Sequence, residues 1–280
     1  MIRKVFDVIG ILVLICFSFY YTEKAVFLIR KKDPIMIKIE EVKTNYSVEA
    51  TNALKINNDS IIPGYNGVEV DINKSYSRMK KIDKFNETML VFNETVPSIS
   101  SMNSKKYIVG GNPRKNMISL VFKVKETREL NRILVLLKNK DIAASFFVDN
   151  KWIEDNINLI YKINNNGHTI HNYGCDNDSI KWTNNLVREL IYKEPKYCYT
   201  EEKNQNILNI CSKNNMGTII PNIIVENYHL FDVNKVIKSG SIISFDTSKT
   251  SLEYLITIIN FIKYKGYNIG TIDTHLSEER

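Results

Sequence analysis

Short apolar runs that alternate with amphipathic stretches constrain the second half of this chain. From residue 118 onward, compact runs typical of buried strands recur: ISLVF, AASFFV, GHTIHN, GTIIPNII, GSIISF and YNIGTI. After the first run, apolar residues return at helical spacing, namely Leu130, Ile133, Leu134 and Leu137. Strands that alternate with helices predict a parallel sheet, because parallel neighbours need a crossover connection. The pattern alone fits both an open sheet and a closed barrel.

The N-terminus carries a different signal, a run of fourteen uncharged residues at positions 8–21. A membrane-spanning helix needs roughly 20 mostly apolar residues, and residues 5–22 approach that length by including Asp7. Arg3 and Lys4 precede the run, so the positive-inside rule places the N-terminus in the cytoplasm. We expect an uncleaved single-pass anchor in the cell membrane, with the rest of the chain extracellular. The alternative is a cleaved signal peptide, which the absence of a small-x-small site after the run disfavours.

Residues 25–115 show a third sequence pattern. A charged stalk at 31–34 is followed by short strand-like runs, IMIKI, ALKI, GVEVDI and MLVF, separated by turn signals such as NNDS and PGYNG. We therefore expect a stalk and a small β-rich accessory domain. The predicted organisation is a cytoplasmic stub and transmembrane anchor at 1–24, the accessory part at 25–115, and the α/β domain at 116–280.

The composition limits the classes of molecule that this chain is expected to bind. The formal charge is +7, but the lysines are spread along the chain and no arginine-rich run appears, which argues against nucleic-acid binding. A modest positive excess suits an anionic cell-wall polymer or a lipid surface. The four cysteines form no Cys-x-x-Cys pair, which argues against a zinc knuckle.

Several motifs in order give the α/β domain a family resemblance. The stretches ISLVF, LNRILVLLKNKDIAASFFV and KWIEDNINLIYKINNNGHTIHN resemble the polysaccharide deacetylase domain, also called the NodB-homology domain of carbohydrate esterase family 4. That family shows Phe-Asp-Asp-Gly after its first strand, then Lys-Ala-Thr-Phe-Phe-Val, then Gly-His-Glu-Ile-Gly-Asn-His-Thr. The C-terminal GSIISFDTSKTSLEYLITIINFIKYKGYNIGTID resembles the closing strand, helix and strand of the family. The resemblance covers about residues 116–280 and implies a distorted (β/α) barrel with its site at the C-terminal ends of the strands.

The resemblance also implies a chemistry, and the residues for it are missing. The family removes acetyl groups from N-acetylated sugars with a divalent metal, usually zinc, held by one Asp and two His. Here the catalytic base position is Lys123, the metal carboxylate is Val124, and the two histidines fall on Tyr173 and Asn177. The third-motif Arg aligns with Cys198 and the late acidic His with Asp246. Because zinc needs three or four N, O or S ligands, we expect no metal cofactor and no catalytic residues.

Two smaller hypotheses concern the same region. The polar residues that could line a carbohydrate groove are Tyr173, Asp176, Asn177, Asp178 and Asp246, although an ordinary polar loop explains them equally well. In the family the loops that carry Cys175 and Cys198 converge, so we hypothesise a disulfide between them if their Cα atoms lie within about 7 Å.

His168 and His171 are candidates for a relocated metal pair. They are three residues apart on a predicted strand, so alternation sends their side chains to opposite faces, and a structural role is favoured.

Two function classes remain from the sequence. One is a membrane-tethered pseudoenzyme that binds a cell-wall glycan or an envelope protein through the cleft that corresponds to the active site of the family. The other is a working de-N-acetylase of peptidoglycan or a related polysaccharide with an atypical site. Simple scaffolding by the accessory part is a third alternative.

Overall fold

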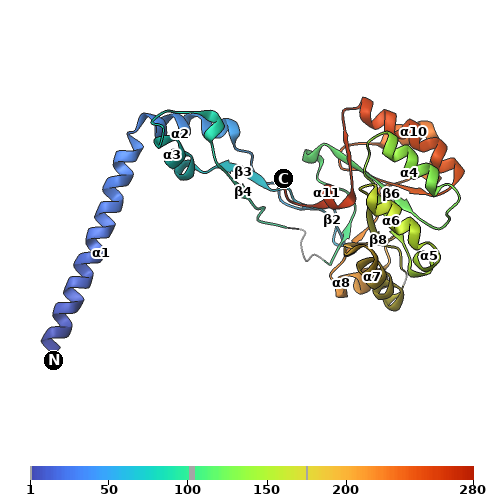
Figure 1. The fold of residues 1–280 in the computed structure, drawn as a ribbon, viewed down its shortest axis with the longest axis horizontal. Helices are drawn as coiled ribbons and strands as arrows, with labels where there is room; N and C mark the ends of the chain where they lie inside the picture. The colour runs from blue at the N-terminus through green and yellow to red at the C-terminus, as the bar shows by residue number, and fades with distance from the viewer. Residues whose placement is uncertain (1, 101–104, 175) are drawn as a thin grey trace. The chain divides into compact units, whose positions relative to one another are not determined.

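The computed structural model describes residues 2–100, 105–174 and 176–280, with the side chains of residues 2–10, 12, 23 and 25–27 left out. The chain divides into two compact units (Figure 1). The smaller comprises Met1–Ala50 and Gly67–Thr95, and the larger comprises Thr51–Asn66 and Val96–Arg280. Residues 51–66 and 96–115, which the sequence assigned to the accessory part, thus belong to the larger compact unit.

Helices dominate the smaller unit. Its helices are α1 (Ile2–Lys31), α2 (Pro34–Tyr46), α3 (Ile72–Lys80) and the 3-10 turn η1 (Glu87–Met89), and its strands β3 (Gly67–Val70) and β4 (Phe92–Thr95) form an antiparallel pair. Asp33 starts α2 by accepting a hydrogen bond from the backbone of Ile35, with Pro34 at the first helical position.

The β-rich prediction for residues 25–115 is wrong at its first run. IMIKI lies in α2, where Ile35, Met36 and Ile39 are buried together against Met79 of α3. Residues spaced one and four apart share a helix face, so a short apolar run satisfied the helical pattern as well as the strand pattern.

The predicted anchor lies in α1. In the part of the chain whose side chains are described, no helix combines the length and the apolar character that crossing a membrane requires. Residues 8–10 and 12 of the apolar run lie outside that described part.

A curled, open parallel sheet forms the larger unit. Its strands lie in the order β1 (Leu54–Lys55), β2 (Ser60–Ile62), β5 (Tyr107–Ile108), β10 (Gly217–Ile219), β9 (Tyr197–Tyr199), β8 (Thr169–Asn172), β7 (Ser145–Val148), β6 (Met117–Lys123), β12 (Ile242–Asp246) and β11 (Ile223–Ile224). The closing strand β13 (Asn268–Gly270) pairs with the beginning of β6. Every pair is parallel except β1 with β2. Among the described residues the end strands β1 and β11 do not pair with each other, so the sheet is a half-barrel.

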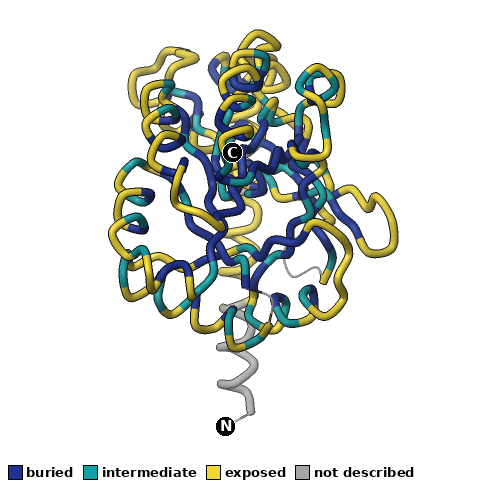
Figure 2. The backbone as a smooth tube through the Cα atoms, turned by 90° about the vertical axis from the view of Figure 1, so that its right-hand side faces the viewer, coloured by how far each residue is buried: buried dark blue, intermediate teal, exposed yellow. Residues whose placement is uncertain are grey.

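Helices cover the outside of this sheet, and exposed backbone surrounds a buried centre in Figure 2. They are α4 (Leu130–Asn139), α5 (Asn150–Asp155), α6 (Ile157–Asn165), α7 (Asn177–Ile191), α8 (Gln205–Lys213), α9 (Leu230–Val236) and α10 (Lys249–Tyr264), with the 3-10 turns η2 (Pro113–Lys115) and η3 (Val225–Asn227) in the connections. The last helix, α11 (Ile272–Leu276), instead packs among the buried residues inside the curl, where Ile272 and Leu276 contact the inner apolar cluster.

Alternation along β6 separates two cores. Ile118, Leu120 and Phe122 join the cluster under the outer helices, and the Phe122 ring stacks on those of Phe146 and Phe245. Val121 instead joins the inner cluster. Because side chains alternate along a strand, Ser119 and Lys123 share the inner face with Val121.

The inner face is layered from the beginnings of the strands to their ends. At the first layer Ser119 Oγ lies 2.8 Å from His275 Nδ1, and His171 Nε2 lies 2.8 Å from Asp273 Oδ2. Both partners come from α11, so the C-terminal segment completes this polar layer. An apolar layer containing Val121 follows, and Lys123 lies at the far end of β6.

The two histidines behave as the alternation predicts. His168 Nδ1 accepts a hydrogen bond from the backbone N–H of Ala144, and its ring packs 5.2 Å from that of Phe146 in the outer cluster. His171 faces Asp273 inside the curl. Burial lowers the pKa of His168 to about 4, so the ring is neutral at pH 7. The prediction that these histidines do not form a metal pair is confirmed by their opposite directions.

The structure contains a disulfide, but with a different partner from the one hypothesised. Cys198 of β9 bonds to Cys211 of α8, with their Cα atoms 6.3 Å apart. The hypothesised Cys175–Cys198 bond is therefore wrong, and Cys175 itself lies outside the described residues. Cys198 lies between Tyr197 and Tyr199 on β9, and alternation turns it away from the interior toward Ile180 and Met216.

Removing this disulfide is expected to destabilise the larger unit. In Cys211→Ala, the free energy of unfolding should fall by about 2–4 kcal/mol, because the bond closes a loop with a sequence separation of 13 residues. Urea unfolding with and without a reducing agent measures this, and the reducing agent should weaken the wild type but not the variant. Peptide mapping that found Cys198 and Cys211 as free thiols in oxidised protein would contradict the pairing.

Candidate functional site

Lys123, the last residue of β6, occupies the mouth of the half-barrel. The residue is 5% exposed, and its ammonium forms ion pairs with Glu201 and with Glu226, the latter at 3.2 Å. A charge this deeply buried is costly unless it is paired and hydrogen-bonded. The two carboxylates meet that requirement from two different loops.

The carboxylates come from the C-terminal ends of three strands of the same sheet. Glu201 follows β9, Glu226 lies in η3 directly after β11, and Asp246 ends β12 in register with Lys123. Parallel strands bring their carboxyl ends to the same edge of the sheet, so residues distant in sequence converge there. We call Lys123, Glu201, Glu226 and Asp246 the Lys123 cluster.

Charge compensation sets the protonation states of the cluster. Burial acts to lower the pKa of Lys123, but the hydrogen bond with Glu201 and the charge of Glu226 outweigh it, so the pKa is raised. Burial raises the pKa of Glu226 despite the attraction of Lys123. Lys123 therefore stays a charged ammonium at neutral pH.

Asp246 is tied down by hydroxyl groups. Its Oδ1 accepts hydrogen bonds from the backbone and side chain of Ser248, at 3.1 and 2.6 Å, and from the side chain of Ser251. Burial would raise the pKa of Asp246, but these hydrogen bonds and one with Glu226 lower it overall. At the position of the family's late acidic His, this carboxylate is a weak base and carries no proton to donate at pH 7.

Two tyrosines form a wall beside the cluster. The Tyr199 hydroxyl lies 2.7 Å from Ser244 Oγ, and burial raises the pKa of Tyr199. The Tyr173 ring meets that of Tyr199 edge-on at 5.6 Å, and the Lys125 ammonium lies 5.7 Å from the Tyr173 centroid. The half-buried Tyr173 therefore presents an aromatic surface close to the mouth.

The other predicted site residues separate into two groups. Val124 packs in the outer core with Phe122, so its side chain is directed away from Lys123 and carries no donor atom. Asp176 caps α7 by accepting from the backbones of Asp178 and Ser179, and Asn177 donates to Asp178 at 3.4 Å.

The structure thus places Tyr173 and Asp246 with the Lys123 cluster and places the other three groove candidates in the first turn of α7. Sequence reasoning missed Glu201 and Glu226. Their signal was an acidic residue within two positions of the end of an apolar run, in YCYTEE and in IIVEN.

The fold of the larger unit is a half-barrel similar to that of polysaccharide deacetylases. Residues 110–216 match the family model described as "Polysaccharide deacetylase", and the order of strands and outer helices fits the α/β fold that this match implies.

The chain is also similar to individual proteins over most of its length. It is 28% identical over 272 residues to the uncharacterised protein YlxY of Bacillus subtilis (strain 168), covering 89% of this chain and 85% of that protein. It also resembles the crystal structure of wild-type BA3943, described as a CE4 family pseudoenzyme from Bacillus anthracis, with a TM-score of 0.70, 26% identity, and coverage of 89% of this chain and 97% of that one. A BA3943 mutant described as having restored enzymatic activity gives a TM-score of 0.70 at 26% identity, covering 88% and 99%.

The residues at the mouth do not fit the metal that the family uses. Val124 offers no ligand, and within the described residues no group of three or more His, Cys, Asp or Glu side chains is arranged to hold a metal ion. The carboxylates that do converge are paired to the Lys123 ammonium, whose positive charge repels a divalent cation.

Replacing Lys123 should leave the carboxylates of Glu201 and Glu226 without their positive partner. In Lys123→Met, the free energy of unfolding at pH 7 is expected to fall by about 1–3 kcal/mol, since Glu201 and Glu226 lose their partner. The loss should shrink as the pH falls from 7 to 5, because uncompensated carboxylates have raised pKa values and take up protons more readily in the folded state. Thermal and urea unfolding at both pH values measure this.

A matched control is Lys235→Met, which removes an exposed ion pair with Asp232 at 2.8 Å. Because exposed pairs contribute about 0–1 kcal/mol, its stability should barely change. Equal stability of Lys123→Met and wild type at pH 7 would contradict the role assigned to the cluster.

Proposed function

We propose that this chain is a catalytically inactive, membrane-anchored polysaccharide deacetylase-like protein that binds a cell-wall glycan or an envelope protein through the mouth of its half-barrel. The single observation that carries the proposal is the Lys123 ammonium. It fills the catalytic base position of the family and is neutralised by Glu201 and Glu226.

The chemistry of the mouth supports inactivity. Deacetylation in this family needs a cation to polarise the acetamide and a base to activate water. A charged ammonium has no free electron pair, so Lys123 cannot accept a proton, and its pKa is raised further by Glu201 and Glu226 despite burial. Asp246 is a poor base because serine hydroxyls stabilise its charge.

The surroundings of the cluster support glycan binding. A cavity of about 320 Å³ lies against Glu226 and is also lined by Tyr228, Ser248 and Tyr254. Together with the ring of Tyr173, these groups offer carboxylate, hydroxyl and aromatic surfaces that hydrogen-bond and stack on sugar rings. BA3943, which has a similar fold, is itself described as a CE4 family pseudoenzyme.

A second candidate rests on Glu226. Burial raises the pKa of this carboxylate, which suits a general acid or base. The alternative is therefore an active de-N-acetylase with an atypical site.

Metal content and acetate release separate the two candidates. We expect purified full-length protein to hold no tightly bound divalent metal and to release no acetate from N-acetylated peptidoglycan fragments. Elemental analysis and an acetate assay measure this, and Glu226→Gln is the control variant. Acetate release by wild type that Glu226→Gln abolishes would overturn the proposal in favour of the active enzyme.

Binding is measured on the same preparation with insoluble peptidoglycan. Tyr173→Ala should weaken binding about tenfold, since it removes the aromatic surface near the mouth. Tyr161→Ala is the matched control, because Tyr161 lies in α6 and is 41% exposed. No retention of the wild type on the glycan would leave an envelope protein as the partner.

The anchor is a separate part of the proposal. Large apolar side chains of α1 are exposed, including Leu14 at 70%, Phe17 at 56% and Phe19 at 69%. Such a surface is costly in water and favourable in a bilayer.

We expect full-length protein to fractionate with membranes and to be released by detergent but not by high salt. Removal of residues 1–24 should make it soluble, because the long apolar run at 8–21 is then gone. Full-length protein in the soluble fraction would contradict the anchor. A mature protein shortened after the apolar run would instead indicate the signal peptide.

A further inference from the structure

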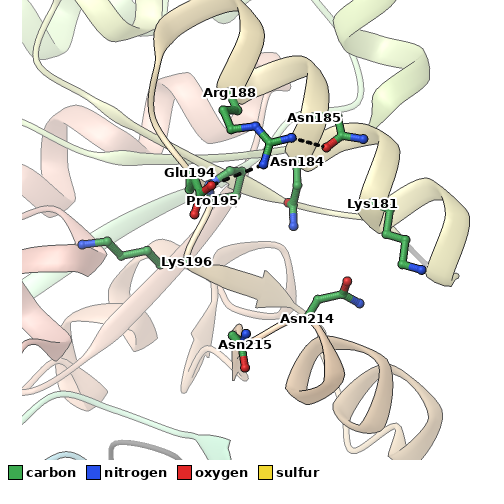
Figure 3. Close-up of a pocket in the computed structure, with 9 residues that line it drawn as sticks. All are labelled: Lys181, Asn184, Asn185, Arg188, Glu194, Pro195, Lys196, Asn214 and Asn215. Carbon is green, nitrogen blue, oxygen red and sulfur yellow. Dashed lines mark hydrogen bonds and ion pairs between the residues drawn. The ribbon is translucent and has the colours of Figure 1, made fainter.

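We infer that a polar cavity beside α7, separate from the Lys123 cluster, binds a saccharide that carries an anionic group. The cavity measures about 420 Å³ and lies between α7 and the turns that precede β9 and β10. Figure 3 shows its walls, which include Lys181, Asn184, Asn185, Arg188, Asn214 and Asn215. The Lys123 cluster lies at the opposite, C-terminal ends of the strands.

The floor of the cavity is fixed in place. Asn184 Oδ1 accepts a hydrogen bond from Asn172 Nδ2 at 2.8 Å, and Asn184 Nδ2 lies 3.2 Å from Met216 Sδ. Met216 in turn contacts Cys198, whose disulfide with Cys211 joins β9 to α8. A site that is held before the ligand arrives loses less entropy on binding.

The asparagines supply the chemistry for sugar hydroxyls. Each side-chain amide has both a donor and an acceptor, which matches the hydroxyl groups of a saccharide. Asn214 and Asn215 follow α8 at the rim opposite Arg188 in Figure 3. The volume lies within the roughly 300–1,000 Å³ range of small-molecule sites. A bare inorganic anion would leave most of these amides unused.

Arg188 supplies the recognition of the anionic group. Its guanidinium donates to Asn185 Oδ1 at 2.8 Å and forms an exposed pair with Glu194 at 3.4 Å. An exposed pair of this length contributes little, so Glu194 can be exchanged for a ligand. The planar fork of arginine binds a carboxylate or phosphate through two parallel hydrogen bonds.

Two lysines line the cavity, but only Lys181 adds positive charge at its rim. Lys181 lines the cavity on the α7 side, where its ammonium adds positive charge near the rim. Lys196 also belongs to the lining, but Figure 3 shows its side chain directed away from the other residues, and its ammonium lies 3.6 Å from Asp273. Arg188 and Lys181 are therefore the cations that meet the ligand.

Calorimetric titration of the full chain tests the inference with four probes: glucuronic acid, glucose 6-phosphate, glucose and inorganic phosphate. At least one of the two acidic sugars should bind about tenfold more tightly than both glucose and inorganic phosphate. Binding of glucuronic acid alone assigns a carboxylate, and binding of glucose 6-phosphate alone assigns a phosphate.

Arg188→Gln should weaken that binding about tenfold. Arg132→Gln is the matched control and should leave it unchanged, because Arg132 is an exposed arginine on α4 that pairs with Glu129 at 2.8 Å. Tyr173→Ala should also leave it unchanged, which separates this site from the mouth. The inference is overturned if neither acidic sugar binds, if glucose or phosphate binds as tightly, or if Arg188→Gln has no effect.

Discussion

A buried ammonium that must be neutralised organises the mouth of this half-barrel. Lys123 is almost fully enclosed at the end of β6, so its charge is tolerable only because Glu201 and Glu226 reach it from two other strand ends. The same arrangement that would gather metal ligands in a deacetylase here gathers carboxylates around a covalently attached cation. The Lys123 ammonium supplies one positive charge at the mouth, and this charge opposes the approach of a divalent cation.

The alternation of side chains along the strands decides what each predicted residue does. On β6 it sends Lys123 inward and Val124 outward into the helix-covered core. On β9 it sends Tyr199 inward and Cys198 toward α8, where the disulfide forms. Because only the inner positions at the strand ends face the mouth, substitutions there change its chemistry while the outward positions keep their packing.

Much of the larger unit could be predicted from sequence, and the reasons for the failures are physical. ISLVF and AASFFV correspond to β6 and β7 because buried parallel strands are continuous apolar runs. IMIKI failed because five residues satisfy a helix and a strand equally well. The ion pairs of Glu201 and Glu226 with Lys123 could not be predicted. The order of the strands in the sheet brings these residues together, and that order cannot be derived from the sequence pattern. The partner of Cys198 depended in the same way on which face of β9 it occupies.

The interleaved path of the backbone has a consequence for susceptibility to proteases. The smaller unit is made of two separate segments, Met1–Ala50 and Gly67–Thr95, so the chain passes between the units three times. Two compact parts joined by one linker are released from each other by a single cut. Here, a cut in any one connection gives two fragments, but at least one unit then contains segments of both fragments, so the packing inside that unit holds the fragments together. After a single cut, the larger unit therefore stays with the N-terminal helix for as long as the cut unit remains folded.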